Sequence, residues 1–207
     1  MNELILFDLD GTLTDSSEGI TKSVVYALKQ FGIDEKPENC LRFVGPPLGP
    51  ELHKVYGIDP DKGVLAFREY FEKQGIYENK LYPNTLETLK KLKENGHTLC
   101  VATSKPEVMA RRVIAHFGLD KYIEKVYGAS LDEKKSAKAD IIQEALDDHP
   151  GMSAVMVGDR MHDIIGAKKC GIFSIGIPSG FGEPDELEKA GADIVLRDIS
   201  QLATIDG

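Results

Sequence analysis

Three absences limit what this sequence can be. It has only three cysteines in 207 residues, Cys40, Cys100 and Cys170, and their wide spacing forms neither a C-x-x-C pair nor a disulfide framework. No run of about 18 apolar residues occurs, so we expect no membrane-spanning helix. Basic residues are in deficit, with 25 Lys and Arg against 34 Asp and Glu. The resulting acidic surface repels nucleic acid and anionic membranes.

The first ten residues lack the basic start and the long apolar segment of a signal peptide. Together with the scarce cysteines, this predicts a cytoplasmic protein that binds neither nucleic acid nor membranes. The length suits one α/β domain with a modest insertion. Nothing in the sequence decides between a monomer and a weak dimer.

Short apolar runs alternate with helical patterns along much of the chain. The runs have strand length and cover residues 4–7, 99–102, 154–157 and 172–175, with a weaker candidate at 194–196. Helical patterns cover residues 85–94, residues 106–118 and a segment that opens near Ser136. Unbroken apolar runs are typical of strands buried on both faces. The alternation therefore predicts an α/β fold with a Rossmann-like, doubly wound parallel sheet.

About ninety residues separate Asp8 from the run at 99–102, far more than a simple crossover needs. This stretch has helical patterns at residues 20–31, 51–56 and 61–74, interrupted by a loop rich in Gly and Pro. We therefore predict a helical domain at residues 15–80, inserted after the first strand of an α/β core made of residues 1–14 and 81–207. We expect the insertion to cover the end of that strand as a cap.

Two carboxylates follow the first strand, in the sequence Asp8-Leu9-Asp10-Gly11-Thr12. Ligands of an open parallel sheet bind at the carboxyl ends of its strands, and side chains two residues apart project to the same side of an extended chain. Like charges in one cleft are costly unless a cation joins them. Hard carboxylate oxygens suit Mg²⁺, which also takes a substrate phosphate oxygen.

A hydroxyl and a lysine join these carboxylates. The run at 99–102 leads into Thr103-Ser104-Lys105-Pro106, where a hydroxyl and the free N–H groups of a helix start would hold a phosphate. Lys138 shares the apolar face of the helix that opens near Ser136, at the end close to the strand tips. Lys134 lies outside this register, but the spacing to Asp159 would also allow it.

The run at 154–157 leads into Gly158-Asp159-Arg160-Met161-His162-Asp163, which adds two carboxylates. An Asp at a helix start can also serve as a cap, so Asp163 has two possible roles. Arg160 and His162 would either touch a substrate or act as an ion-pair residue and a polar loop residue.

Taken in order, Asp8-Leu9-Asp10-Gly11-Thr12-Leu13, the strand that ends in Thr103, Lys138 and Gly158-Asp159-x-x-x-Asp163 resemble the haloacid dehalogenase superfamily of phosphatases. The insertion resembles the helical cap of the branch that contains phosphoglycolate phosphatase and β-phosphoglucomutase. The resemblance implies a Mg²⁺-dependent phosphomonoester hydrolase. Its substrate would be a small phosphorylated metabolite, either phosphoglycolate-like, a sugar phosphate or a nucleoside monophosphate.

The resemblance also implies residue roles. Asp8 would be the nucleophile that takes the phosphoryl group, and Asp10 would act as general acid and then as general base. Mg²⁺ would be held by Asp8, by the backbone carbonyl of Asp10 and by Asp159. Asp163 would bind the metal or would orient Lys138 or a water on the metal, and Lys138 would neutralise the charge of the phosphoryl group.

Thr103 and the amide groups that follow Asp8 would bind the transferring phosphoryl group. Weaker candidates for contacts with the phosphate or the rest of the substrate are Gly11, Thr12, Ser104, Arg42, Gly45 and Arg68. The loop that contains Gly45 has an alternative role as a rigid connection between helices, and either arginine has an alternative role at the surface.

Two other functions stay open at this point. A phosphomutase of the β-phosphoglucomutase type would use the same intermediate and would need a sugar bisphosphate primer. A non-catalytic binding protein would need no nucleophile, so the presence of Asp8 argues against it. Haloacid dehalogenation uses no Mg²⁺ and leaves the acid at Asp10 without a task.

Overall fold

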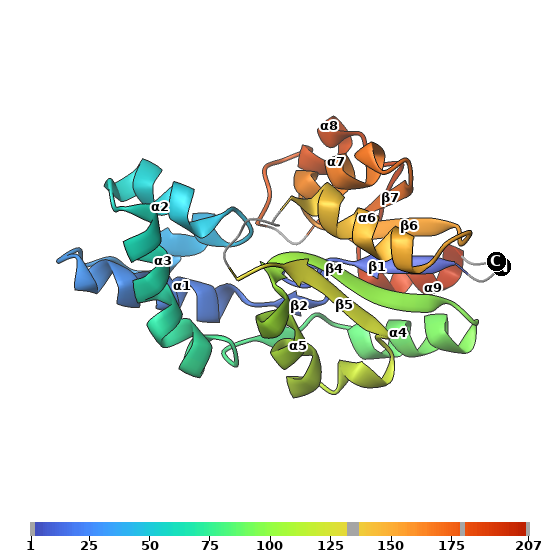
Figure 1. The fold of residues 1–207 in the computed structure, drawn as a ribbon, viewed down its shortest axis with the longest axis horizontal. Helices are drawn as coiled ribbons and strands as arrows, with labels where there is room; N and C mark the ends of the chain where they lie inside the picture. The colour runs from blue at the N-terminus through green and yellow to red at the C-terminus, as the bar shows by residue number, and fades with distance from the viewer. Residues whose placement is uncertain (1–2, 132–136, 179–180, 206–207) are drawn as a thin grey trace. The chain divides into compact units, whose positions relative to one another are not determined.

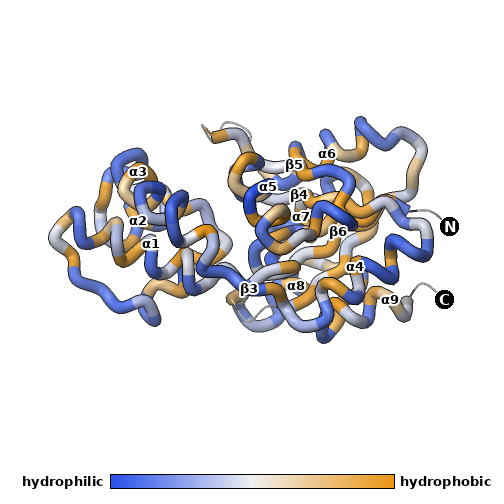
Figure 2. Tube along the Cα trace, turned by 90° about the horizontal axis from the view of Figure 1, so that it is seen from below, coloured by the Kyte–Doolittle hydropathy of each residue, from blue (hydrophilic) through white to orange (hydrophobic). Residues whose placement is uncertain are grey.

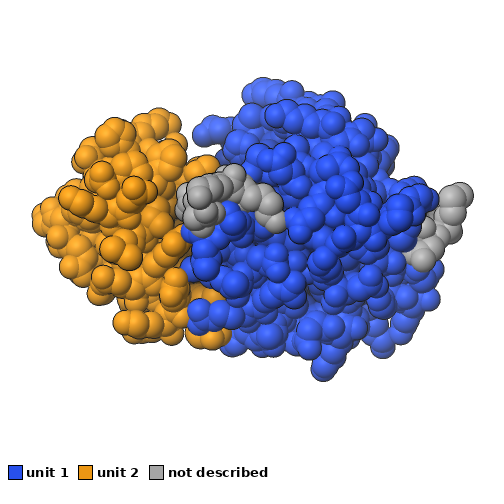
Figure 3. Space-filling model, in the orientation of Figure 1, with its two compact units in different colours: residues 1–14, 81–207 blue, residues 15–80 orange. Residues whose placement is uncertain are grey.

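A computed structural model describes residues 3–131, 137–178 and 181–205 of the chain (Figure 1). The chain divides into two compact units, coloured separately in Figure 3. Residues 1–14 and 81–207 form the first, called here the α/β unit, and residues 15–80 form the second, called here the helical unit.

The α/β unit is built on a parallel sheet, which in the described residues has six strands. They are β1 (Leu4–Phe7), β4 (Thr98–Pro106), β5 (Lys125–Ala129), β6 (Ala154–Gly158), β7 (Phe173–Gly176) and β8 (Ile194–Val195). Their order is β5-β4-β1-β6-β7-β8, and each neighbouring pair is parallel. The predicted α/β fold is thus confirmed, with the first strand of the chain in the middle of the sheet.

Helices cover both faces of this sheet (Figure 1). One face carries α6 (Lys138–Asp148) and α7 (Met161–Lys169), and the other carries α4 (Thr85–Glu94) and α5 (Glu107–His116), with α9 (Leu202–Ile205) packed against α4. The short elements η3 (Leu119–Lys121), α8 (Glu186–Ala190) and η4 (Ile199–Gln201) complete the unit. None of the helices in the described ranges is both long and apolar enough to cross a bilayer.

The core explains why the central strands read as unbroken apolar runs. Leu4 and Leu6 belong to one buried cluster with Ile141 and Ile142 of α6, while alternate residues such as Phe7 are fully buried on the opposite face. Figure 2 shows hydrophobic segments in the strands of the sheet, as well as along parts of the helices of both units. Burial on both faces removes the alternation of polar residues that a half-exposed strand would show.

The helical unit consists of α1 (Ser17–Gln30), η1 (Pro37–Phe43), α2 (Leu48–Tyr56), α3 (Pro60–Tyr70) and the π-helical turn η2 (Phe71–Gly75). Gly19 of α1 approaches η2 so closely that a Cβ atom there would lie 1.8 Å from the carbonyl oxygen of Gly75. The chain passes between the two units in β2 (Thr14–Asp15) and β3 (Lys80–Leu81), which pair with each other.

The structure differs from the sequence-based expectations in several places, of which the following bear on the site and the two units. Strand β5 and the 3₁₀ helix η1 were not anticipated. The helix expected at 61–74 is divided between α3 and the π-helical turn. The helix expected to open near Ser136 begins at Lys138, and Ser136 itself lies outside the described residues.

Candidate active site

The sheet brings its polar residues together at one edge. Phe7, the last residue of β1, pairs with Val101 of β4 on one side and with Val157 of β6 on the other. The chain therefore places Asp8 between the ends of two neighbouring strands. This is the edge at which parallel α/β sheets bind ligands.

Lys138 is the centre of the buried charges. It is the first residue of α6, and only 5% of its side chain is exposed. Its Nζ donates to Asp8 Oδ1 and to the carbonyl oxygen of Ala102, both at 2.9 Å, and lies 2.8 Å from Asp163 Oδ1. Burial lowers the pKa of Lys138, but the carboxylates of Asp163 and Asp8 outweigh it, so the pKa lies above its ordinary value. The ammonium group stays charged at neutral pH.

The carboxylate of Asp8 is kept in an unfavourable environment. Burial raises the pKa of Asp8 to about 6, although Lys138 opposes the rise. The nearby carboxylates of Asp163 and Asp10 add to the rise. One ammonium group thus fails to offset the cost of the charge, and a further cation beside Asp8 would relieve it.

The acidic residues fit a divalent metal ion. Oxygen atoms of Asp8, Asp159 and Asp163 lie within 4.8 Å of one another, and all three residues are buried. Oxygen ligands at about 2.1 Å from an octahedral Mg²⁺ lie roughly 3 to 4 Å apart, which this upper limit allows. The carboxylate of Asp10 is not part of the cluster, because its Oδ2 pairs with Lys105 at 2.8 Å.

The tight loop that follows Asp8 contacts Asp159, another member of the acidic cluster. Gly11 has φ +94°, and a Cβ atom there would lie 2.2 Å from Asp159 Oδ2, so the position excludes a side chain. The Thr12 hydroxyl donates to Asp159 Oδ1 at 3.1 Å. The N–H groups of Gly11 and Thr12 donate within the loop, to the carbonyl oxygens of Thr14 and Leu9. Both predicted phosphate contacts therefore use their N–H groups to shape the loop, and the Thr12 hydroxyl also supports Asp159.

The end of β4 supplies the hydroxyl that the sequence indicated. Thr103 is buried, and its Oγ1 accepts a hydrogen bond from the backbone N–H of Lys105 at 3.3 Å. Ser104, the other candidate of this segment, is exposed. The ammonium group of Lys105 pairs with Asp10, a contact that was not predicted from the sequence.

Asp163 makes two buried contacts, one near the start of α7 and one with Lys138. Its Oδ2 accepts from the backbone N–H of Arg160 at 3.1 Å, as a residue near a helix start does, while its Oδ1 faces Lys138. Both carboxylate oxygens are thus already engaged.

Glu186 is a second residue that sequence reasoning missed. Its Oε1 accepts from Arg160 Nε at 2.9 Å and from the backbone N–H of Met161 at 2.7 Å. Burial would raise the pKa of Glu186, but these donors outweigh it and hold the pKa below its usual value. Arg160 therefore forms a mostly buried ion pair that fixes the loop between Asp159 and Asp163, and His162 lies exposed beside it.

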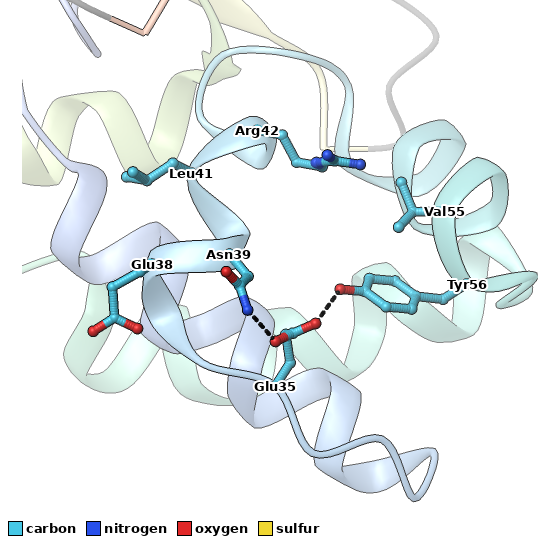
Figure 4. Close-up of a pocket in the computed structure, with 7 residues that line it drawn as sticks. All are labelled: Glu35, Glu38, Asn39, Leu41, Arg42, Val55 and Tyr56. Carbon is cyan, nitrogen blue, oxygen red and sulfur yellow. Dashed lines mark hydrogen bonds between the residues drawn. The ribbon is translucent and has the colours of Figure 1, made fainter.

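Three predicted substrate contacts, Arg42, Gly45 and Arg68, lie in the helical unit. Gly45 has φ +101° in the loop before α2, and Arg68 lies half-buried on α3. Arg42 lines a pocket of about 570 Å³ whose wall is shown in Figure 4. Glu35 lies on the opposite side of the pocket, where it accepts from Asn39 Nδ2 at 2.7 Å and from the Tyr56 hydroxyl at 3.2 Å. The alternative lysine, Lys134, lies outside the described residues.

A parallel sheet that holds a buried carboxylate, an ammonium group and an acidic cluster at one edge is suited to phosphoryl chemistry. Residues 5–177 match the family of haloacid dehalogenase-like hydrolases. The chain therefore belongs to this family, and its phosphatase relatives and structural neighbours show that it is a phosphatase.

Three relatives illustrate the range of the family. A 5′-nucleotidase of Pseudomonas aeruginosa is 46% identical over 190 residues, which cover 88% of this chain and 86% of that protein. The tyrosine-protein kinase PtkA of Mycobacterium tuberculosis is 37% identical over 209 residues, which cover 99% of this chain and 70% of the kinase. The crystal structure of a predicted phosphatase from Clostridium acetobutylicum superposes with a TM-score of 0.92 at 42% identity, covering 99% of this chain and 98% of that one.

Proposed function

We propose that this phosphatase hydrolyses phosphomonoesters in two steps, through a phosphoryl group carried covalently by Asp8. The observation that supports this most directly is the buried carboxylate of Asp8, held at 2.9 Å by the ammonium group of Lys138 at the end of β1. A covalent route divides one difficult hydrolysis into two easier transfers. Strongly perturbed carboxylates of this kind cluster at functional sites, which supports a chemical role for Asp8.

The first step breaks the bond between phosphorus and the leaving oxygen while a carboxylate oxygen of Asp8 bonds to phosphorus. Asp10 donates a proton to the leaving oxygen in this step. In the second step Asp10 takes a proton from the attacking water, whose oxygen bonds to phosphorus as the bond to Asp8 breaks. Asp10 thus regains the proton it gave, and inorganic phosphate is released.

The anionic oxygens of the phosphoryl group need donors throughout both steps. Thr103 Oγ1, the ammonium group of Lys138 and the N–H groups that directly follow Asp8 supply them in this proposal. Gly11 and Thr12 use their N–H groups inside the loop, so the proposed amide donors are those of Leu9 and Asp10.

The metal proposed for this reaction is Mg²⁺. Asp8, Asp159 and the backbone carbonyl of Asp10 would hold it, and Asp163, whose oxygens are engaged by Lys138 and Arg160, would orient Lys138. When bound, Mg²⁺ would screen the repulsion between the anionic nucleophile and the anionic substrate.

Nucleoside 5′-monophosphates are the substrate class we propose to test first. The proposal rests on the 46% identity to a protein named 5′-nucleotidase over 88% of this chain. A phosphoglycolate-like acid and a sugar phosphate are the other candidates from the sequence.

The test is phosphate release from a panel of nucleoside 5′-monophosphates, phosphoglycolate, sugar phosphates and p-nitrophenyl phosphate, each with Mg²⁺ and with excess EDTA. Release that requires Mg²⁺ and is absent in Asp8→Asn supports the mechanism, and the best ester identifies the substrate class. Substantial turnover by a verified, uncontaminated Asp8→Asn would refute the nucleophile assignment. No hydrolysis, together with isomerisation of a sugar phosphate primed by a sugar bisphosphate, would favour the phosphomutase.

A further inference from the structure

Lys105 is a second buried ammonium group at this edge of the sheet. Only 6% of its side chain is exposed, and its Nζ lies 2.8 Å from Asp10 Oδ2. Burial of an ammonium group is costly unless it is paired and hydrogen-bonded. Here the partner is the carboxylate of Asp10, the proposed proton carrier, so the pair fixes the residue on which proton transfer would depend.

The backbone of β4 is shaped to deliver this side chain. Thr103 pairs with Gly128 of β5, but the next pairing joins Pro106 to Ala129, so the register shifts across the segment that contains Lys105. Irregularities of this kind change the direction in which a side chain points and are common beside active sites. A Cβ atom on Gly128 would lie 2.8 Å from the carbonyl oxygen of Lys105, so β5 accommodates the irregular segment by having a glycine there.

The pairing treats the two oxygens of Asp10 differently. Oδ2 is held by Lys105, whereas Oδ1 is buried and, within the described residues, has no hydrogen-bond partner. When one carboxylate oxygen is held by a partner and the other has none, only the second oxygen is placed to exchange a proton. Free rotation of the Asp10 carboxylate would let either oxygen face the substrate, and the fixed orientation would be lost.

From this geometry, and resting on the proposed function of Asp10, we propose that Lys105 is a positioning residue for proton transfer. It holds Asp10 Oδ2 so that Oδ1 is the atom that gives its proton to the leaving oxygen and later takes one from water. Lys105 itself exchanges no proton and need not touch the substrate.

The two chemical steps can be separated by the choice of leaving group. The ratio kcat/KM covers the reaction up to transfer of the phosphoryl group to Asp8, and only that transfer releases the leaving group. A nitrophenolate leaves without a proton, whereas the alkoxide of a nucleoside 5′-monophosphate needs one. A misplaced Asp10 therefore lowers kcat/KM for the nucleotide and leaves it nearly intact for p-nitrophenyl phosphate.

The experiment measures both kinetic parameters for both esters in Lys105→Met, which keeps the length of the side chain and removes the charge. We expect kcat/KM to fall by about 10²-fold for the nucleotide and by less than about 5-fold for p-nitrophenyl phosphate. For the nitrophenyl ester, kcat and KM should both fall by a similar factor, so that their ratio is kept. The reason is that hydrolysis of the phosphorylated Asp8 still needs Asp10 as the base. Lys121→Met, the same change at an exposed lysine of the α/β unit, should alter neither ester.

Asp10→Asn and the double variant complete the test. Asp10→Asn should show the same selective loss for the nucleotide, and adding Lys105→Met to it should cost little more. Lys105→Gln is measured in parallel, with circular dichroism of each variant, so that the result does not depend on one protein folding well.

Equal losses for the two esters in Lys105→Met and Lys105→Gln, or a rise of KM alone, would overturn the positioning role while the function of Asp10 stands. Absence of the selective loss in Asp10→Asn would instead refute Asp10 as the proton carrier, and the role of Lys105 with it. The two failures appear in different variants and are therefore distinguishable.

Discussion

Replacement of Asp8 by Asn should stabilise the metal-free protein while it removes activity. The folded protein raises the pKa of Asp8 from 3.8 to about 6, chiefly by burial. Since one pKa unit corresponds to about 1.4 kcal/mol, the ionised carboxylate destabilises the fold by an amount on the order of 3 kcal/mol at pH 7.5. Asn has nearly the same shape and no charge, so it should remove most of this cost.

The sign of the pH dependence follows from the same pKa. Above about pH 6 Asp8 is ionised in both the folded and the unfolded chain, and the full cost is present. Between pH 6 and 3.8 the folded protein keeps a proton that the unfolded chain has lost, so the cost fades as the pH falls. The stability advantage of Asp8→Asn should therefore shrink to roughly half by pH 5.

The assay is urea unfolding of wild type and Asp8→Asn in EDTA at pH 5 and pH 7.5, followed by circular dichroism. Added Mg²⁺ should stabilise wild type more than the variant, because binding to the folded state alone adds to its stability and Asn is the poorer ligand. Two results would refute the view that burial of the ionised Asp8 carboxylate destabilises the fold. One is a variant no more stable than wild type at pH 7.5, and the other is a stability advantage that grows toward pH 5.

Three further substitutions test other parts of the site. Lys138→Ala should reduce kcat/KM far more than Lys134→Ala, because it leaves two buried carboxylates without their ammonium group. The reverse ranking in steady-state kinetics would identify Lys134 as the lysine of the site. Gly11→Ala should destabilise the fold by about 1–3 kcal/mol in urea unfolding, because its Cβ would meet Asp159 at a φ that side chains avoid; an unchanged midpoint would contradict the loop geometry. Glu186→Gln should weaken Mg²⁺ binding about tenfold in calorimetric titration, since it loosens the loop that carries a metal ligand; unaltered affinity would show that Arg160 needs no such support.

The sequence predicted the central strands because their environment leaves a clear pattern. Residues 4–7, 99–102 and 154–157 are apolar throughout because helices cover both faces of the sheet. Strand β5 has no such pattern, since its sequence Lys-Val-Tyr-Gly-Ala lies at the edge of the sheet and contains both a lysine and a glycine. The glycine is required there by the close approach of residues 105–107 of the neighbouring chain segment.

The residues of the site were predictable to the extent that they follow strands. Asp8 comes directly after an apolar run, Asp159 follows another after a single glycine, and Lys138 lies on the apolar face of a helix. Lys105 gives no comparable signal, because its partner Asp10 is 95 positions away and the contact depends on an irregular register in β4. Glu186 likewise meets Arg160 only through the fold, and no periodicity of its own short helix marks it.

The central position of β1 in the sheet has a consequence for folding during translation. This strand is synthesised first, but its neighbours in the sheet pair Leu4 with Thr98 and with Ala154, so it must wait for most of the chain. Contacts between such distant segments form slowly and leave apolar surface exposed meanwhile. A nascent chain that stops before β6 carries Asp8 without Asp159, so the acidic cluster of Asp8, Asp159 and Asp163 can form only after most of the chain has been synthesised.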